Sequence, residues 1–278
     1  GNYAIVGARY DDFPLGSNTG SAYIFNVKTG QELHKLSAGD GRGSDWFGHF
    51  VAISGNYAIV GASGDDDDGS NSGSAYIFNA KTGKRMHKIT ANNAEENDCF
   101  GRGGVAISGN YAVVGGDSAN SITGSNNGAA YVFDVRSGVQ LYKLSSEELG
   151  TDTGRRFGYS VAIDNNTIIV GSIWSDINGS KSGSAYIFAP TLYKDSKLLS
   201  TYDDGKVEIR GHLQIGEFEN TDVFSNEMRL LSNYMPWFPA NDYNSYLGED
   251  VGISGKYCIV ARPYSDEQKL NSGTAYIY

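Results

Sequence analysis

The chain contains little cysteine, little proline and no long apolar run. Its 278 residues include 2 cysteines and 5 prolines, and two cysteines cannot form a disulfide framework. Cys99 and Cys258 lie in segments that we do not expect to be neighbours, so both are predicted to be free thiols that pack as small apolar groups. No apolar run approaches the ~20 residues that a membrane-spanning helix requires. We therefore expect no membrane insertion in this segment.

Positive charge is also scarce. The chain has 22 Lys and Arg against 32 Asp and Glu, a formal net charge of -10 and a pI of about 4.8. A nucleic-acid partner is not expected, because neutralising phosphates requires a basic face. Neither is there a polybasic or strongly amphipathic stretch that would bind an anionic membrane surface. The first residue is Gly1 rather than Met, and it already lies inside a repeat, which predicts a trimmed or partial chain.

Signatures of catalysis are missing as well. The sequence contains no HExxH, GxSxG or Cys-His constellation. Of its 4 histidines, His34 and His87 occupy equivalent edge-strand positions, and the other two share no evident partner. Acidic pairs are numerous, so the sequence leaves a glycosidase-like dyad open, but no pair stands apart from the others. We expect a protein that is not an enzyme.

What the chain does have is an internal repeat. GNYAIVG at Gly1 returns in related form near Gly55, Gly109, Asp164 and Gly255. A second segment, GSAYIF, begins at Gly20, Gly73, Gly128, Gly183 and Gly273, so its copies start 53, 55, 55 and 90 residues apart. A period of this size indicates a repeat architecture, in which neighbouring units cover one another's apolar faces.

One copy, Phe47 to Thr90, shows what each repeat contains. Four short runs within it have strand character and are separated by turn residues: 49–54, 57–62, 74–79 and 85–90. The middle two runs are apolar on both faces, so both faces must be covered. The fourth carries Lys and His, as a protected edge strand does. The pattern predicts an all-β fold, a β-propeller of four-stranded antiparallel blades packed face to face.

The pairs Phe47-Gly48 and Gly61-Ala62 resemble the FG-GAP repeat of integrin α-chain propellers. The first pair recurs at Phe100 and Phe157 and weakens to Leu247-Gly248. The resemblance covers nearly the whole chain and implies a propeller in which five repeats are visible. Counting strands gives three, four, four, four and three, and integrin-like propellers have seven blades. Either the chain is a fragment of a longer propeller or the insertion supplies the missing strands. We favour the fragment and expect this chain to be part of a seven-bladed propeller.

A single propeller array over 1–278 follows from the repeats. The predicted repeat boundaries are 1–46, 47–99, 100–156, 157–245 and 246–278. The fourth repeat is lengthened by an insertion at about 189–245, which we interpret as an elaborated outer strand and a long loop packed on the propeller.

This sequence differs from the integrin-type repeat at the position of the calcium site. Integrin-type repeats carry calcium ligands in a D-x-D-x-D-G loop between their first two strands, and here that position holds only short turns such as Ser54-Gly55-Asn56. Acidic residues gather instead in the loop between the second and third strands, with the densest run at Asp65, Asp66, Asp67 and Asp68. Calcium requires six to eight oxygen ligands, and this run supplies part of a candidate calcium site. The alternative is a solvated loop tip that repels itself.

Other candidate sites lie in loops and in the insertion. Aromatic residues concentrate binding energy at interfaces, and four of them are candidates for partner binding: Trp46, Trp174, Tyr234 and Trp237. Tyr234 and Trp237 lie in the insertion, and for them a role as a local hydrophobic plug is an equal alternative to partner binding. Asn165 and Asn178 begin N-x-S/T sequences and are candidate glycosylation sites.

The leading functional prediction is a non-enzymatic extracellular or cell-surface propeller. It would recognise a protein or glycan through the loops that join strands two to three and four to one. One alternative is a structural subunit that contacts other subunits of an extracellular assembly. Another is a carbohydrate-active enzyme, because propellers also carry hydrolases and lyases.

Overall fold

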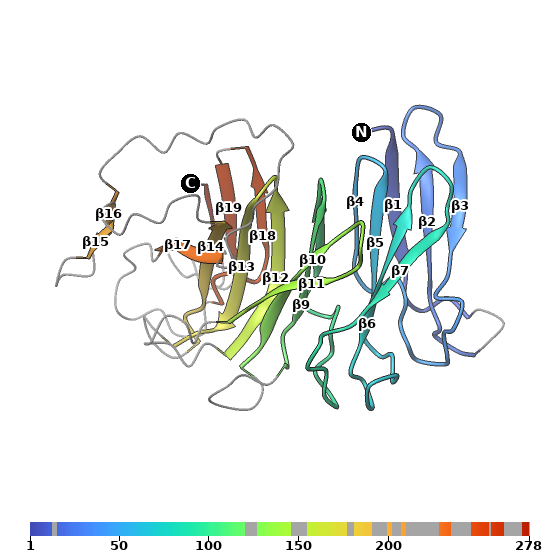
Figure 1. Cartoon of the computed structure of the whole chain (residues 1–278), viewed down its shortest axis with the longest axis horizontal. Coiled ribbons are helices and arrows are strands. Elements are labelled where there is room, and N and C mark those ends of the chain that lie inside the picture. Colours follow the sequence, from blue (N-terminus) through green and yellow to red (C-terminus); the bar gives the residue numbers. More distant parts are fainter. Residues whose placement is uncertain are drawn as a thin grey trace.

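The structure is a computed structural model of the chain. It describes residues 1–12, 16–119, 127–145, 155–176, 181–190, 199–201, 207–209, 228–234, 246–255, 257–263 and 274–277. The regular elements in these ranges are all β-strands (Figure 1). Among the same residues, no helix is long and apolar enough to cross a membrane.

Five antiparallel sheets follow one another along the chain. The first contains β1 (Tyr3–Ala8), β2 (Ser21–Asn26) and β3 (Glu32–Leu36). The second contains β4 (Val51–Ser54), β5 (Tyr57–Ala62), β6 (Ser74–Asn79) and β7 (Arg85–Ile89). The third contains β8 (Val105–Ser108), β9 (Tyr111–Gly116), β10 (Ala129–Asp134) and β11 (Gln140–Leu144).

The fourth and fifth sheets frame the insertion. The fourth contains β12 (Arg155–Asp164), β13 (Thr167–Trp174), β14 (Ser184–Pro190) and β17 (Met228–Tyr234). The fifth contains β18 (Val251–Ser254), β19 (Tyr257–Arg262) and β20 (Thr274–Ile277). The insertion therefore supplies the outer strand of the fourth sheet, as expected. It also holds a separate hairpin of β15 (Leu199–Thr201) and β16 (Val207–Ile209).

The strands of the second sheet confirm the four runs predicted in one repeat. They pair in chain order, with Val60 of β5 opposite Tyr76 of β6. Gly55, between β4 and β5, has a φ of +56°, a conformation that glycine adopts without strain. All-β blades of this kind match the predicted fold class, while closure into a ring and the number of seven blades stay predictions.

Neighbouring sheets pack face to face through both faces of their inner strands. Val60 packs toward the first sheet in a cluster with Ile24. Ile59, one residue earlier on β5, packs toward the third sheet in a cluster with Phe100 and Val114. The same alternation continues between the later sheets. The double-faced apolar pattern in the sequence therefore has the expected cause, because each inner sheet is covered on both sides.

The outer faces of the first and last sheets are less covered. Val6 on β1 is 53% exposed, although its counterpart Val60 is fully buried. Tyr257, Ile259 and Ile277 of the last sheet are 58%, 43% and 72% exposed. Cys99 and Cys258 are buried and unbridged, as predicted.

The first residue of each FG pair connects one blade to the blade before it. Phe47, Phe100, Phe157 and Leu247 each form an isolated parallel bridge to the glycine that begins the preceding GSAYIF-type strand. The backbone N–H of Phe100 donates to the carbonyl oxygen of Ser72 at 2.9 Å, and equivalent bonds of 2.9 to 3.0 Å start from the other three residues. Each bridge is thus a backbone connection between two sheets.

The phenylalanine rings fill the space that this bridge creates. Phe47, Phe100 and Phe157 have no exposed surface. The ring of Phe100 lies 5.4 Å from the ring of Tyr131 and 5.8 Å from that of Phe133, both on β10 of its own blade. Phe47 and Phe157 make the same two contacts in their blades. Tilted and edge-to-face contacts at these separations are favourable for aromatic rings.

Glycine is required where the bridge brings two backbones together. A Cβ atom on Gly73 would lie 2.2 Å from the carbonyl oxygen of Phe100, and Gly20, Gly128 and Gly183 show the same conflict with their partners. Gly61 faces the carbonyl oxygen of Gly101, and a Cβ there would lie 2.7 Å from it. The glycines that begin the GSAYIF-type strands, and Gly61 of the GAP-type pair, are therefore explained by the close approach of neighbouring blades.

A pair of glycine substitutions in one blade tests this explanation. Gly73→Ala should lower the free energy of unfolding by about 1–3 kcal/mol more than Gly55→Ala, because a backbone oxygen occupies the place of the new methyl group. Gly55 is the matched control, since it also has a positive φ but no atom within 4 Å of its Cβ position. Urea unfolding of both variants gives the comparison. Equal losses would contradict the close approach between blades.

Candidate functional site: the loop face

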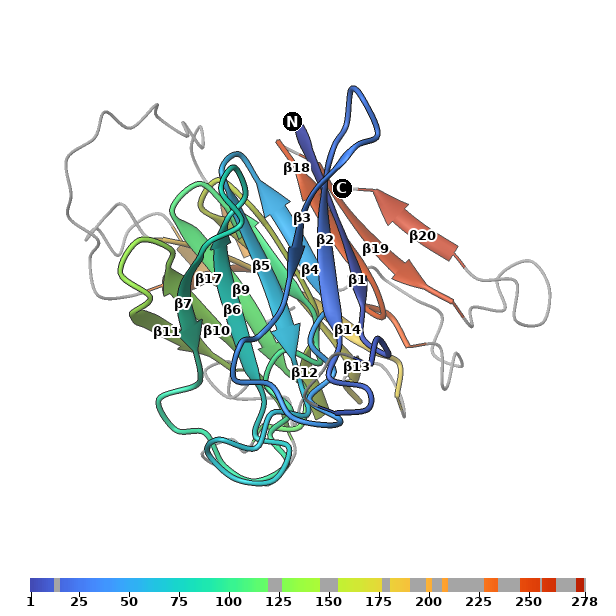
Figure 2. The ribbon, with the colours of Figure 1, turned by 90° about the vertical axis from the view of Figure 1, so that its right-hand side faces the viewer.

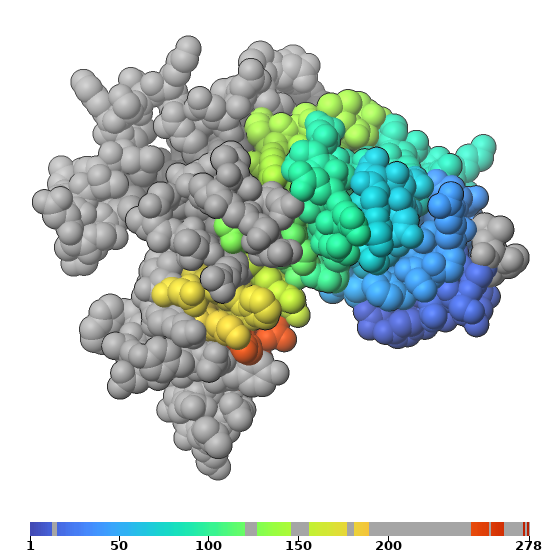
Figure 3. All heavy atoms as spheres, turned by 90° about the horizontal axis from the view of Figure 1, so that it is seen from below, coloured from blue at the N-terminus to red at the C-terminus, as the bar shows by residue number. Residues whose placement is uncertain are grey.

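The loops between the second and third strands and the links between blades lie at one end of the sheets (Figure 1 and Figure 2). Figure 3 shows this end from below, with consecutive blades side by side. We call this end the loop face. The loops that join strands two to three and those that join strands four to one therefore share one face.

Backbone hydrogen bonds fasten the two kinds of loop to each other. The N–H groups of Trp46 and Cys99 donate to the carbonyl oxygens of Asn18 and Asn71 at 3.2 and 3.0 Å. The four residues that precede the FG pairs all have positive φ values of 53° to 61°: Trp46, Cys99, Arg156 and Tyr246. The same strained conformation in four copies indicates that the loop path is a fixed part of the repeat.

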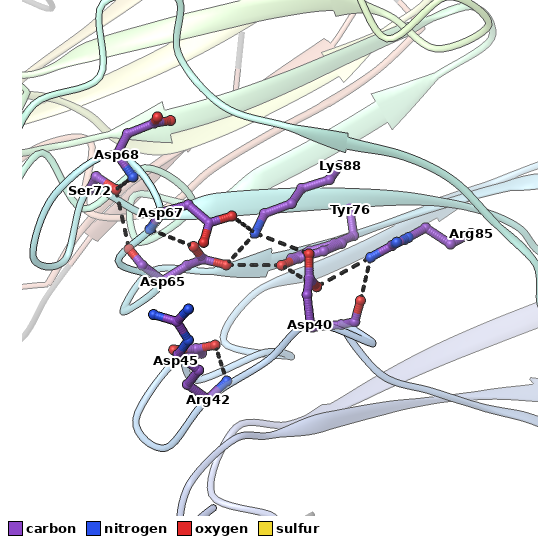
Figure 4. A network of polar contacts seen from close by, with 11 residues as sticks. Asp40, Arg42, Asp45, Asp65, Asp67, Asp68, Ser72, Tyr76, Arg85 and Lys88 are labelled. Atoms are coloured by element: carbon purple, nitrogen blue, oxygen red, sulfur yellow. Dashed lines mark hydrogen bonds and ion pairs between the residues drawn. The ribbon is translucent and has the colours of Figure 1, made fainter. Parts of the chain in front are cut away.

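Asp65 is the centre of a polar network at the rim of this face (Figure 4). Its side chain is 5% exposed, accepts a hydrogen bond from the hydroxyl of Tyr76 at 2.9 Å and pairs with the ammonium of Lys88 at 2.9 Å. Lys88 also pairs with Asp67 and, at 3.3 Å, with Asp40. Burial raises the pKa of Tyr76, and the charge of Asp65 adds to the rise. The network ties the loop between β5 and β6 to the outer strand β7.

The first blade repeats this arrangement. Asp11 accepts hydrogen bonds from the hydroxyls of Ser21 at 2.6 Å and Tyr23 at 3.0 Å, and it pairs with Lys35 at 2.9 Å. These bonds, with that from Ser21 the largest cause, lower the pKa of Asp11 to about 2. The equivalent positions in the third and fourth blades are Ala119 and Ser175, because their carbonyl oxygens accept the same bond from the GSAYIF glycine. Asp65 thus has a structural role that Asp11 shares.

The four carboxylates of the predicted calcium site do not converge. Asp66 accepts the backbone N–H of Asn71 at 2.7 Å, and Asp67 is paired with Lys88. The backbone N–H of Asp68 donates to the hydroxyl of Ser72 at 3.3 Å. In the described part of the chain, no group of three or more His, Cys, Asp or Glu side chains is arranged to hold a metal ion. Calcium binding stays a prediction of the sequence.

Asp45 lies just before the Trp46-Phe47 step, in the link between the first two blades. Only 4% of its surface is exposed, and its carboxylate accepts the backbone N–H of Arg42 at 2.5 Å. Burial raises the pKa of Asp45 to about 6; the bond from Arg42 opposes the rise, and the charges of Asp65 and Asp66 add to it.

A second set of polar side chains follows the FG glycines. In consecutive blades the residue after this glycine is His49, Arg102, Tyr159 or Glu249. His49 accepts a hydrogen bond from Arg9 on Nε2, which assigns the ring proton to Nδ1 and makes Nδ1 the donor to the hydroxyl of Ser63 at 2.7 Å. Burial, together with the charges of Arg9 and Arg102, lowers the pKa of His49 to about 4.

Arg102 and Arg156 share one carboxylate. Arg102 donates to Asp117 through Nε at 2.9 Å and through Nη2 at 3.2 Å, and Arg156 pairs with the same carboxylate at 3.4 Å. Asp117 is buried, whereas the two arginine side chains are each 32% exposed. Arg156 lies 4.1 Å over the ring of Trp174, and the ammonium of Lys181 lies 5.0 Å from that ring. We call Arg9, Arg102 and Arg156 the arginine row.

The predicted binding residues are divided between described and undescribed parts. Trp46 and Trp174 are half-buried on the loop face, with the Trp46 ring 6.3 Å from that of His49. Tyr234 ends β17, where its backbone is paired with Ala185, but its side chain lies outside the described residues, as do Trp237 and Asn178. Asn165 is exposed in the turn between β12 and β13.

The arginine row was not identified from the sequence. Its residues are separated by tens of positions and occupy different places in the repeat, and only the packing of the blades brings them to one end of the fold. The available signal was variation: the residue after the FG glycine differs in all four copies, although the glycine before it recurs in each. A comparison of the copies at this position would have singled out Arg102, but not Arg9 or Arg156.

Comparison with known proteins identifies the repeats. The family model described as FG-GAP repeat matches residues 31–78, 84–133 and 150–188. The chain is an FG-GAP repeat protein. The search of curated proteins gave no match.

Two computationally designed proteins are among the solved structures that match this chain. The Ika8 protein has 13% sequence identity and a TM-score of 0.50, and the match covers 100% of this chain and 55% of Ika8. The Ika4 protein has 11% identity and a TM-score of 0.43, with 83% of this chain and 89% of Ika4 covered. The chain therefore spans about half the length of Ika8. At this identity, the likeness to Ika8 concerns the fold alone.

Asp45 gives a pH-dependent prediction for the site. Its pKa is raised from 3.8 to about 6 on folding, so its ionisation destabilises the folded state as pH rises between these values. Asp45→Asn keeps an oxygen acceptor for Arg42 and removes this effect. The variant should therefore gain stability relative to the unchanged protein from pH 4 to about pH 6, and the gain should level off above that. Denaturant unfolding at pH 4, 5, 6 and 7 measures the difference in stability between the variant and the unchanged protein. A difference that does not change with pH would contradict the raised pKa of Asp45.

Proposed function

We propose that this FG-GAP protein is a non-enzymatic recognition module of the extracellular space or cell surface. It binds a protein or glycan through the loop face. FG-GAP repeats are typical of extracellular or surface proteins, which supports the location. Asn165, exposed in its turn, is an accessible glycosylation site in this proposal.

One observation carries the proposal: a constant frame supports variable side chains. The bridge glycines and their strand contacts recur in blade after blade. At the loop face, the residue after the FG glycine is His49, Arg102, Tyr159 or Glu249, and the residue after the GA-type pair is Arg9, Ser63, Asp117 or Ile173. A purely structural repeat does not require this variation, whereas a binding surface carried by loops on a rigid scaffold does.

The loop face is also pre-organised. Backbone bonds join the loops between blades, and the ion pairs of Asp11 and Asp65 fix the rim. A surface that is already ordered loses less conformational entropy on binding, so more of its contact energy becomes affinity. Trp46 and Trp174 lie on this ordered surface as half-buried aromatic anchors.

Absence of catalysis is part of the proposal. The carboxyl with the raised pKa, Asp45, is bonded to the backbone of its own turn, and its neighbour Asp65 is paired with Lys88. Neither arrangement is typical of an acid and base that flank a substrate bond. The role of structural subunit stays a second prediction of the sequence.

An array experiment with matched variants tests the proposal. The purified protein is applied to glycans and to purified extracellular proteins, alongside Trp174→Ala and Val139→Ala. Val139 is 55% exposed and lies in the turn between β10 and β11, away from the loop face. Trp174→Ala should weaken binding about tenfold or more, as expected for an aromatic anchor, and Val139→Ala should leave it unchanged.

Two outcomes would overturn the proposal. One is a ligand whose binding is equally insensitive to both substitutions. The other is product release from any bound glycan during prolonged incubation, because turnover would make the protein an enzyme.

A further inference from the structure

We propose that the arginine row binds the carboxylates of an acidic oligosaccharide. This inference rests on the proposed recognition function and names its ligand class. The juxtaposition that supports it is three guanidinium groups and two adjoining aromatic rings, contributed by the first, third and fourth blades to one end of the fold.

Each guanidinium keeps donors that the described contacts do not use. Arg102 engages Asp117 through Nε and Nη2 and leaves Nη1. Arg156 uses Nη1 for Asp117, and Arg9 uses Nη1 for His49, so each keeps Nε and Nη2. A guanidinium presents five N–H donors in a planar fork that matches a carboxylate, and its unused edge is therefore a ready partner for an incoming carboxylate.

The positive charges of the arginine row are also only partly balanced by carboxylates in contact with them. Among the described residues, Asp117 is the carboxylate in ion-pair contact with the row, and two arginines share it. His49, with its pKa lowered to about 4, is neutral at pH 7, so it neither adds to the positive charge of Arg9 nor compensates it. This leaves a local site of positive charge on a chain whose net charge is -10.

The net negative charge of the protein limits the kind of anion that can bind the arginine row. A long polyanion such as nucleic acid would be repelled by the rest of the surface, so its phosphate chain gains little from a site of this size. A short ligand that carries separate single charges can bind the arginine row without this repulsion. An oligosaccharide with one carboxylate on each sugar unit is such a ligand.

Aromatic rings beside the arginines favour a sugar over an acidic peptide. Arg9 lies 4.6 Å over the ring of Tyr10, which is 63% exposed, and Arg156 lies 4.1 Å over Trp174. Phe50 is 41% exposed and stacks on His49 at 5.0 Å. A pyranose ring has an apolar C–H face and a polar edge, so a uronate can place one against an aromatic ring and the other against a guanidinium. Binding sites of this composition combine aromatic walls with a few fixed polar groups.

Calorimetry with defined uronates tests the inference. The probes are tetramers of galacturonate, mannuronate and glucuronate, each with its fully methyl-esterified form, and a tetraglutamate peptide. The proteins are the unchanged chain, Arg156→Gln, Arg9→Gln and Arg136→Gln. Arg136 is the matched control because its exposed side chain lies in the turn between β10 and β11, so its substitution removes the same charge away from the loop face.

The expected result is binding of at least one uronate at least tenfold tighter than its ester. Arg156→Gln and Arg9→Gln should each weaken this binding about tenfold, since a charge-assisted hydrogen bond is lost, and neither should affect the ester. Arg136→Gln should change affinity less than twofold. Arg156→Gln is informative because Asp117 keeps both of its bonds to Arg102, and an unchanged unfolding midpoint confirms its fold.

Several results would overturn the inference. They are equal affinity for acid and ester, binding of no uronate, tighter binding of tetraglutamate, or equal effects of Arg156→Gln and Arg136→Gln. The proposed recognition function is judged separately: a ligand found on the arrays that depends on Trp174 but not on the arginine row would support that function while overturning this ligand class.

Discussion

The contact between an FG residue and the glycine of the preceding blade is the constraint on which the rest of the structure depends. A blade by itself exposes two apolar faces, and it becomes stable only when neighbours cover both. The parallel bridge fixes how closely and in what register those neighbours meet. The buried phenylalanine ring then fills the space above the tyrosine and phenylalanine of its own blade. Glycine is needed at the bridge because the partner backbone occupies the place of a side chain.

This constraint explains how the loop face is built. The bridge holds the link before each FG pair against the preceding loop, where further backbone bonds form. Side chains just beyond the bridge, such as His49 and Arg102, are therefore carried at fixed positions on neighbouring blades. Their chemistry can change from blade to blade without altering the frame, since they lie outside the apolar clusters. A rigid frame with variable edges is the physical basis of the proposed recognition function.

Much of the fold could be predicted from the sequence because it depends on local, repeated patterns. The strands from Tyr57 and Ser74 were predicted from β-rich runs between turn residues, and the covering of both faces followed from their lack of alternation. The outer strand of the fourth blade was expected within the insertion, but its position at Met228–Tyr234 was not, because no repeat marks it.

The site was harder to predict because it depends on contacts between blades. The sequence drew attention to Asp65–Asp68 as a dense acidic run, yet Asp65 is directed to Tyr76 and Lys88 of its own sheet. Residues as distant as Arg9 and His49, or Asp117 and Arg156, meet through the packing of blades. Composition showed a net negative charge and could not show that arginines gather at one place.

Amide hydrogen exchange tests the central claim most directly. The N–H groups of Phe47, Phe100 and Phe157 lie in links between blades, where isolated loops would exchange quickly. If the bridges join the blades, these three amides should be protected as strongly as those in the middle of β5 and β9. Exchange at the rate of exposed turn amides such as that of Gly109 would contradict the account.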